Sequence, residues 1–218
     1  MNEILHTTIL GMKRGSDVSV KDAEAVLDAI LASEDRKILV DLLTAWNQKG
    51  ITEDEIYGFA AVLRARCRRV HGHEDSVDIV GTGGGSQKPF NVSTAAAFVA
   101  AGAGLMIAKQ SNRGVATRMG SADVLTELGV KVASEPSVAQ TSLNGVAISF
   151  LFAPKFHDSL KRVAEVRRSL GIRTCLNLLG VLANPAGVNR SLIGVWHQSM
   201  VEPAAKALAL LKTDKSWV

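Results

Sequence analysis

A run of glycines with the potential to bind an anion stands directly after a short apolar segment. Gly81-Thr82-Gly83-Gly84-Gly85-Ser86 follows residues 77–80, and Asn91-Val92-Ser93-Thr94 then opens an alanine-rich segment. The run lacks the Gly-Lys-Ser/Thr of a Walker loop, and Ser86 stands where a dinucleotide fingerprint requires its third glycine. Glycine backbone brings N–H groups close to an anion, and a polar-capped helix amino terminus adds its dipole. The pattern predicts phosphate binding, and the alternative is a tight turn.

A second polar segment follows the next apolar run. Lys109-Gln110-Ser111-Asn112-Arg113-Gly114 comes after residues 105–108, and Gly120-Ser121-Ala122-Asp123 begins another helical stretch. These residues provide two cations and several hydrogen-bonding side chains. A polar surface loop before a helix capped at Ser121 is the alternative interpretation. Two loops suited to anions at neighbouring strand ends favour a single pocket.

The elements that must position these loops alternate between strands and helices from residue 77 onward. We predict strands at 77–80, 105–108, 130–133, 146–152 and 192–196, and helices at 93–102, 121–128, 137–143, 157–170 and 200–212. This alternation predicts a mostly parallel sheet covered on both faces. Ligands of such sheets bind at the carboxyl ends of the strands, where both polar segments lie.

The first 70 residues predict helices. They are marked by a capping pair at Ser19 and Asp22, a second helix from Ser33 to Gly50, and a capping box at Thr52 and Glu55. The third helix ends in Arg64, Arg66, Arg68 and Arg69, cations that suit the negative end of a helix dipole. A nucleic-acid contact is less favoured, because no aromatic residues are interleaved to stack on bases.

Composition narrows the class of protein. The chain has 218 residues, 47% of them hydrophobic, which excludes an intrinsically disordered chain. No apolar run reaches the roughly 18 residues that span a bilayer, and no secretory signal is visible, so we expect a cytoplasmic protein without membrane contact. Cys67 and Cys175 are too few for a disulfide framework.

The charge is distributed unevenly along the chain. Residues 1–75 carry 10 Lys/Arg against 13 Asp/Glu, whereas residues 76–218 carry 15 Lys/Arg against 8 Asp/Glu. The basic second part therefore suits a phosphorylated small molecule or a nucleic acid.

Five segments carry a resemblance to a known family. They are Asp78-Ile79-Val80-Gly81-Thr82-Gly83-Gly84, Phe90-Asn91-Val92-Ser93-Thr94-Ala95-Ala96, Gly120-Ser121-Ala122-Asp123-Val124-Leu125, Leu170-Gly171-Ile172-Arg173-Thr174 and Asn184-Pro185-Ala186-Gly187. In this order, and essentially from end to end, the chain resembles anthranilate phosphoribosyltransferases. The resemblance implies an α/β fold with two parts: a small helical domain, residues 1–70, that forms a homodimer, and a mostly parallel-sheet α/β domain, residues 71–218, that binds phosphoribosyl pyrophosphate. The implied reaction transfers a phosphoribosyl group to the amine of anthranilate in tryptophan biosynthesis, with Mg²⁺.

The resemblance also implies the site residues. Those expected to bind phosphoribosyl pyrophosphate are Gly81, Gly84, Gly85, Pro89, Asn91, Val92, Ser93, Thr94, Lys109, Gln110, Ser111, Asn112, Arg113, Gly114, Val115, Ala116, Thr117 and Ser121. Those expected at anthranilate are Gly81, Asn112, His157 and Arg167. Arg167 would match the carboxylate with a planar fork, and Ser93 would face Mg²⁺. For His157, a place at the start of a helix is an equal alternative.

Several positions depart from the family pattern. Gly85 stands where the glycine loop usually ends in Asp, Gln110 and Ser111 replace a His-Gly pair, and Val181 replaces a Pro. Family members continue well past Val218 and include an Asp-Glu pair that binds magnesium. We therefore expect an α/β domain that is incomplete at its carboxyl end, and weak or absent activity in the 218-residue form.

Two other functions stay open. A nucleoside phosphorylase would share the architecture and an anion-binding glycine loop, but Asn112 and Arg167 argue against it. A catalytically silent relative could bind nucleic acid or another polyanion through the basic half. The spread of basic residues over many loops, instead of along a groove, makes nucleic acid a less favoured partner.

Overall fold

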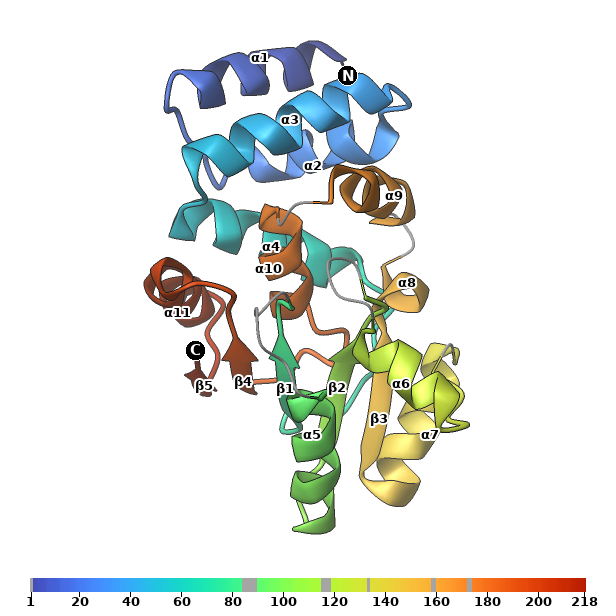
Figure 1. Ribbon diagram of the computed structural model, residues 1–218. Coiled ribbons are helices and arrows are strands. Elements are labelled where there is room, and N and C mark those ends of the chain that lie inside the picture. The colour runs from blue at the N-terminus through green and yellow to red at the C-terminus, as the bar shows by residue number, and fades with distance from the viewer. Residues whose placement is uncertain (1, 84–89, 115–118, 133, 158–159, 172–173) are drawn as a thin grey trace.

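The computed structural model describes residues 2–83, 90–114, 119–132, 134–157, 160–171 and 174–218. In Figure 1 a layer of helices forms the upper part of the molecule, and a sheet with its covering helices forms the lower part. The upper layer begins with α1 (Asn2–Lys13), α2 (Ala23–Ala32), α3 (Arg36–Lys49) and α4 (Glu53–Arg66). Among the described residues, no helix is long and apolar enough to cross a membrane.

The sheet has five strands, all parallel, in the order β3-β2-β1-β4-β5. Their bounds are Val77–Gly81 (β1), Ile107–Ser111 (β2), Ile148–Phe152 (β3), Arg190–Gly194 (β4) and Lys215–Trp217 (β5). Helix α5 (Val92–Gly102) packs on the face that contains Ile79 and Ile107. The opposite face is covered by α7 (Pro136–Val146) and by residues 183–188. The predicted α/β fold with a parallel sheet covered on both faces is confirmed.

Two strand predictions are wrong in an informative way. The second strand begins at Ile107 rather than residue 105, so Lys109, Gln110 and Ser111 lie inside β2 and are buried, not in the loop after it. Residues 130–132 form no strand. Val132 is buried against Phe152 without joining the ladder, and a turn at Gly129 (φ 82°) leads the chain away from the sheet. The apolar pattern at this position therefore reflects packing alone.

The remaining helices modify the expected pattern. Helix α6 (Ser121–Glu127) matches its prediction. The helix predicted at 157–170 is matched by α9 (Lys161–Leu170), and the short α8 (Ala153–Phe156) lies before its predicted start. Helix α11 (Val201–Leu210) follows the 3₁₀ turn η2 (Gln198–Met200). Helices α1 and α10 (Cys175–Leu182) were not expected. Helix α10 escapes periodicity rules because five of its eight residues are buried, and a helix that is apolar nearly all round shows no amphipathic stripe.

The helical layer draws on both ends of the chain. Val163 of α9, Leu179 of α10 and Ala204 of α11 share one apolar core with helices α1–α4. At the centre of the layer, the Trp46 and Phe59 rings lie with their centroids 4.7 Å apart. Tertiary contacts thus join the later helices to the layer that the first four helices begin.

Local signals at the helix ends agree with the predictions in most places. The Asp35 carboxylate caps α3 by accepting from Lys37 N and Ile38 N, and Gly50 ends that helix with a φ of 89°. Helix α2 begins at Ala23, after a turn in which the Ser19 hydroxyl donates to Asp22 (2.6 Å). Arg66, in the last turn of α4, forms ion pairs with the α2 carboxylates of Glu24 and Asp28. This pairing gives Arg66 a structural role.

Candidate functional site

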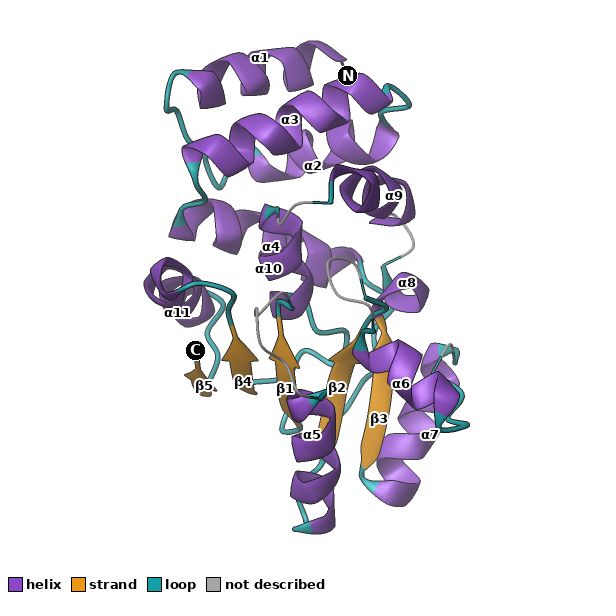
Figure 2. Ribbon diagram, viewed as in Figure 1, coloured by secondary structure: helices purple, strands orange, loops and turns teal. Residues whose placement is uncertain are grey.

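The carboxyl edge of the sheet faces the helical layer. Figure 2 shows the arrowheads of β1 and β2 pointing toward α10 and α4. Strands β1 and β4 stay paired up to Gly81 and Gly194. Just beyond them, Thr82 N–H and the Thr82 hydroxyl both donate to the Gly194 carbonyl, at 2.8 and 3.2 Å. The close pairing of the two strands places Gly81 at a fixed point on this edge.

The amino terminus of α5 provides the second part of the edge. The Asn91 carbonyl accepts from Thr94 N and Ala95 N, both at 3.0 Å, and begins the helix. The Asn91 side chain makes no capping bond. Asn91 and Ser93 are half-exposed, and Val92 is exposed, whereas Thr94 is buried. Asn91, Val92 and Ser93 therefore present main-chain or side-chain polar groups to solvent. They do so at the amino terminus of a helix, which suits an anion. Gly84, Gly85 and Pro89 lie outside the described residues.

Lys109 occupies an unexpected position for a phosphate ligand. Its side chain is buried (2% exposed), and its ammonium donates to the Ile79 carbonyl at 2.5 Å. The charge lies close to the buried Asp78, where it helps to lower the pKa of that carboxyl. The structure therefore gives Lys109 a place between β1 and β2.

Asp78 and Asn184 form a polar pair within the sheet that the predictions did not include. Asp78 Oδ2 accepts from Asn184 Nδ2 at 2.7 Å, and Asp78 Oδ1 accepts from Gln110 N at 3.1 Å. Burial is the largest effect on Asp78 and raises its pKa to about 6, against the opposing effects of Lys109 and Asn184. The available signal was a carboxylate inside an otherwise apolar strand, which is rare without a partner.

Gln110 and Ser111 end β2 with buried polar side chains. Gln110 Nε2 donates to the Gly180 carbonyl of α10 at 2.5 Å. The Gln110 Oε1 and Ser111 Oγ atoms are buried and have no hydrogen-bond partner among the residues that the structure describes. Unsatisfied buried oxygens are uncommon in folded proteins and mark positions where a donor group would be stabilised.

One carboxylate organises the loop after β2. Asp123 Oδ2 accepts from Gly114 N (2.8 Å) and Gly120 N (2.7 Å), so it closes the two ends of the loop together. Asn112 N–H donates to the Ser121 hydroxyl at 3.3 Å, and the exposed Asn112 side chain accepts from Arg113 N at 2.8 Å. The structure thus brings four of the predicted site residues, Asn112, Arg113, Gly114 and Ser121, together at one loop. Val115, Ala116 and Thr117 lie outside the described residues.

Close packing explains why residue 120 is a glycine. A Cβ atom on Gly120 would lie 2.5 Å from the Asn112 carbonyl oxygen and from Gly114 N. No real Cβ contact is that short, so any side chain would displace the loop.

Two of the four residues predicted at the acceptor, His157 and Arg167, lie at the end of α8 and on α9 rather than in the loops of the sheet edge. His157 is buried and ends α8, so its predicted place at a helix start is wrong. Its Nε2–H donates to the Ala183 carbonyl at 2.9 Å, and burial lowers the pKa of the imidazole. Arg167 lies half-buried on α9, which packs against α2 and α3 in the helical layer. The charge of Arg167 acts on the buried Cys175 thiol at the start of α10, where burial raises the pKa of that thiol.

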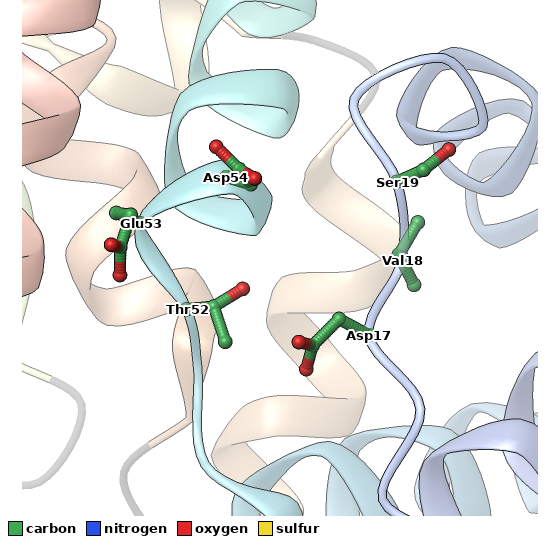
Figure 3. Close-up of a pocket in the computed structure, with 6 residues that line it drawn as sticks. All are labelled: Asp17, Val18, Ser19, Thr52, Glu53 and Asp54. Carbon is green, nitrogen blue, oxygen red and sulfur yellow. The ribbon is translucent and has the colours of Figure 1, made fainter.

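Away from the sheet edge, the described residues form a hollow in the helical layer but offer no metal site. They contain no group of three His, Cys, Asp or Glu side chains that could hold a metal ion. A hollow of about 410 Å³ lies in the helical layer between the α1–α2 connection and the start of α4 (Figure 3). Two of its three lining carboxylates are paired with cations, Asp17 with Lys49 and Glu53 with Lys206, and Asp54 is the third. This acidic hollow does not suit a phosphate, so the sheet edge is the better candidate for the site.

Comparison with known proteins places this geometry in a family. Residues 73–218 match the model of the glycosyl transferase family, a/b domain. An anthranilate phosphoribosyltransferase of Pelotomaculum thermopropionicum is 47% identical over 206 residues, which are 94% of this chain and 60% of that protein. A second, from Lachnoclostridium phytofermentans, is 43% identical over 93% of this chain and 60% of its own length.

Solved structures agree with the sequence matches. The crystal structure of anthranilate phosphoribosyltransferase from Thermus thermophilus superposes with a TM-score of 0.85 at 37% identity, over 94% of this chain and 63% of that one. The Saccharomyces cerevisiae enzyme in complex with PRPP and Mg has a TM-score of 0.81 at 28% identity, over 96% and 64%. The chain spans about three-fifths of the length of the relatives it matches. The family model covers the sheet and all of the helices that surround it, and the chain therefore belongs to the glycosyl transferase family.

Proposed function

We propose that this chain carries the donor-binding part of an enzyme that transfers a phosphoribosyl group from phosphoribosyl pyrophosphate to anthranilate, a step of tryptophan biosynthesis. The observation that carries the proposal is the similarity to anthranilate phosphoribosyltransferases over 94% of the chain, at 47% identity. The sheet edge supports it, because Gly81, the amino terminus of α5 and the Asn112 loop all lie where a parallel sheet binds its ligands.

The chemistry suits the groups at this edge. Displacement of pyrophosphate from an anomeric carbon builds positive charge on the sugar and negative charge on the leaving group. Main-chain N–H groups near Gly81 and the first turn of α5 would stabilise the pyrophosphate as it leaves. The Asn112 amide would orient the acceptor, and the Arg167 guanidinium would pair with its carboxylate. Holding both substrates in line supplies much of the rate enhancement in such a reaction.

The proposal is tested by the fluorescence of anthranilate, which is lost when its amine is ribosylated. The chain is mixed with anthranilate, phosphoribosyl pyrophosphate and Mg²⁺, alongside any longer product of the same gene. A donor-dependent loss of fluorescence is expected, and R167Q should raise the anthranilate KM more than it lowers kcat. If fluorescence is unchanged in every preparation that binds donor, anthranilate is not the acceptor. Phosphorolysis of a pyrimidine nucleoside would identify a phosphorylase instead.

Mg²⁺ fits the described residues only in part. The Ser93 hydroxyl, in the first turn of α5, would supply one oxygen ligand, whereas Mg²⁺ prefers six oxygens, often from one or two carboxylates together with substrate phosphates. No catalytic step is therefore derived through the metal, and we expect the 218-residue form to turn over weakly. Calorimetric titration with donor, with and without Mg²⁺, measures how much the metal adds to binding.

A homodimer formed through residues 1–70 is part of the same proposal. The exposed apolar side chains of Ile4 and Leu10 on α1 support a contact there. Analytical ultracentrifugation should give twice the chain mass, and I4E with L10E should shift it toward one chain. A monomer in the unchanged protein would refute this assembly.

A further inference from the structure

Strands β1 and β2 are joined by main-chain bonds near their amino ends and by side chains beyond. Val77 lies opposite Ile107, whereas β1 and β4 are matched position by position from Val77 to Gly81. Past that pair, Gln110 N–H donates to Asp78 Oδ1 (3.1 Å), and the Ile79 carbonyl accepts from the Lys109 ammonium (2.5 Å). A continued parallel ladder would join Gln110 N–H to the Ile79 carbonyl. Both groups of that ladder bond are instead bound to side chains.

Asn184 adds further side-chain hydrogen bonds between β1 and β2, where the main-chain ladder is interrupted. Its Nδ2 donates both to Asp78 Oδ2 (2.7 Å) and to the Ala108 carbonyl of β2 (2.8 Å), and its Oδ1 accepts from Ala186 N (2.8 Å). Asp78 and Asn184 are 1% and 2% exposed, so no water competes for these bonds. Asn184 follows α10, and it therefore ties β1, β2 and the connection to β4 into one buried unit.

The buried charge of Asp78 is compensated by the groups around it. A buried carboxylate is costly unless it is paired and hydrogen-bonded, and Asp78 has Lys109 nearby together with donors from Asn184 and Gln110. Apolar side chains at these positions would fill the same volume but would leave the main-chain groups of Gln110 and Ile79 free to close the ladder. Retention of the polar unit therefore sets the spacing of the two strand ends.

We propose that Asp78 and Asn184 are positioning residues for the phosphorylated sugar donor. By replacing the last ladder bond between β1 and β2, they hold Gly81 and the Ser111–Asn112 segment at the separation that the donor requires. This inference rests on the proposed function for its ligand. Neither side chain touches the donor, because both are buried below the sheet edge.

A reciprocal exchange of the two side chains tests the proposal. In D78N, two amide groups face each other as donors, and Lys109 loses its carboxylate. In N184D, two carboxylates face each other. In the double variant D78N/N184D, the amide at position 78 can again donate to a carboxylate at 184, and the negative charge stays near Lys109, whereas the Ala108 carbonyl loses its donor. D75N, which removes an exposed carboxylate three residues earlier, is the matched control.

Two readouts separate positioning from folding. Amide hydrogen exchange at Gln110 reports whether the strand end is held, and calorimetry reports the donor Kd. In D78N, the Gln110 amide should exchange about tenfold faster, and the donor Kd should rise about tenfold. Both changes are of the size expected for loss of one charge-assisted bond. The double variant should recover part of the D78N loss, because the bond between positions 78 and 184 is restored while the Ala108 carbonyl lacks its donor, and D75N should match the unchanged chain. If D78N does not fold, N184A removes the bridge without adding repulsion.

The outcomes are distinguishable. Unchanged Gln110 exchange in a folded D78N would show that the pair does not hold the strands. Faster exchange with an unchanged donor Kd would show that it does not position the donor. If the unchanged chain binds no donor, the proposed function is refuted, and so is the role of Asp78 and Asn184 in positioning the donor. The exchange rates at Gln110 would still show whether the two side chains hold the ends of β1 and β2.

Discussion

At Asp78, burial disfavours the carboxylate more than its partners favour it, and the pKa rises to about 6 from an ordinary value of 3.8. The folded state therefore binds a proton at a higher pH than the unfolded state does. This group adds stability to the folded chain as the pH falls through 6, with the full effect present below 3.8, and the stability is lost as the pH rises through 6.

The pH dependence can be isolated by comparison with D78N, which does not titrate at this position. The free energy of unfolding is measured by urea denaturation from pH 4 to pH 8. As the pH falls from 7 to 4, the free energy of unfolding of the unchanged chain should rise relative to that of D78N. The increase should be at most about 3 kcal/mol for a pKa shift of this size. A difference between the two proteins that is flat with pH would contradict the assignment.

The close packing around Gly120 predicts that a side chain at this position would disturb the loop after β2. G120A would place a methyl group 2.5 Å from the Asn112 carbonyl oxygen and Gly114 N, both of which belong to main chain that cannot rotate away. The variant should lose about 1–3 kcal/mol of unfolding free energy and bind donor more weakly, because the Asn112 loop must move.

G145A is the matched control for G120A. Gly145 lies in α7 with open space around its missing side chain. Alanine there should leave donor binding unchanged and add up to about 1 kcal/mol to the unfolding free energy. Equal effects of the two substitutions would show that the tight contact at Gly120 is not limiting.

Between elements, a single buried carboxylate joins the helices of the upper layer. Glu55, fully buried on α4, accepts from Val18 N (2.9 Å), Trp46 Nε1 (3.1 Å) and Lys49 Nζ (3.0 Å), and from Thr52 N (3.1 Å) at its own helix start. The capping box seen in the sequence thus also connects the α1–α2 loop and α3. The Glu55 half of the box forms, whereas the Thr52 hydroxyl has no hydrogen-bond partner within the described part of the chain.

E55Q should therefore destabilise the helical layer strongly. The amide cannot accept from every donor that surrounds it, and the buried Lys49 would lose its buried charged partner and keep the half-exposed Asp17. We expect a loss of about 3 kcal/mol in unfolding free energy, measured by denaturant melts followed by circular dichroism. D54N, an exposed neighbour on the same helix turn, should change stability by less than about 0.5 kcal/mol. Similar losses in both variants would contradict the buried network.

Across the whole molecule, the later helices make the helical layer and the sheet depend on each other. Leu179 of α10 is fully buried in the core that α1–α4 share with α9 and α11, and α10 also contacts the end of β2 through Gly180. L179A should cost about 2–5 kcal/mol and lower the stability of both parts in one cooperative transition.

The cooperativity is checked with two probes of unfolding. Hydrogen exchange of the Trp46 indole N–H, which donates to Glu55, reports on the helical layer, and hydrogen exchange of β1 amides reports on the sheet. Both should shift together in L179A, while L128A, at a side chain that is 71% exposed, should shift neither. Separate transitions would show that the two parts fold independently.

Local patterns in the sequence determined the class of fold and most of its elements. Alternating apolar runs predicted the parallel sheet, glycine and capping residues marked the ends of α3 and the start of α4, and the motif order indicated the family. These features depend on neighbouring residues, so periodicity and capping rules can detect them. The same rules predicted a strand at 130–133, because burial of Val132 by packing leaves the same apolar pattern as a ladder.

Only the tertiary structure decided which polar residues meet. The Asp78–Asn184 bond joins residues 106 positions apart, Lys109 lies buried between strands instead of at an open loop, and Arg167 lies in the helical layer. Periodicity carries no signal for such pairs, because hydrogen bonding and charge compensation inside the protein depend on which segments the whole chain brings into contact.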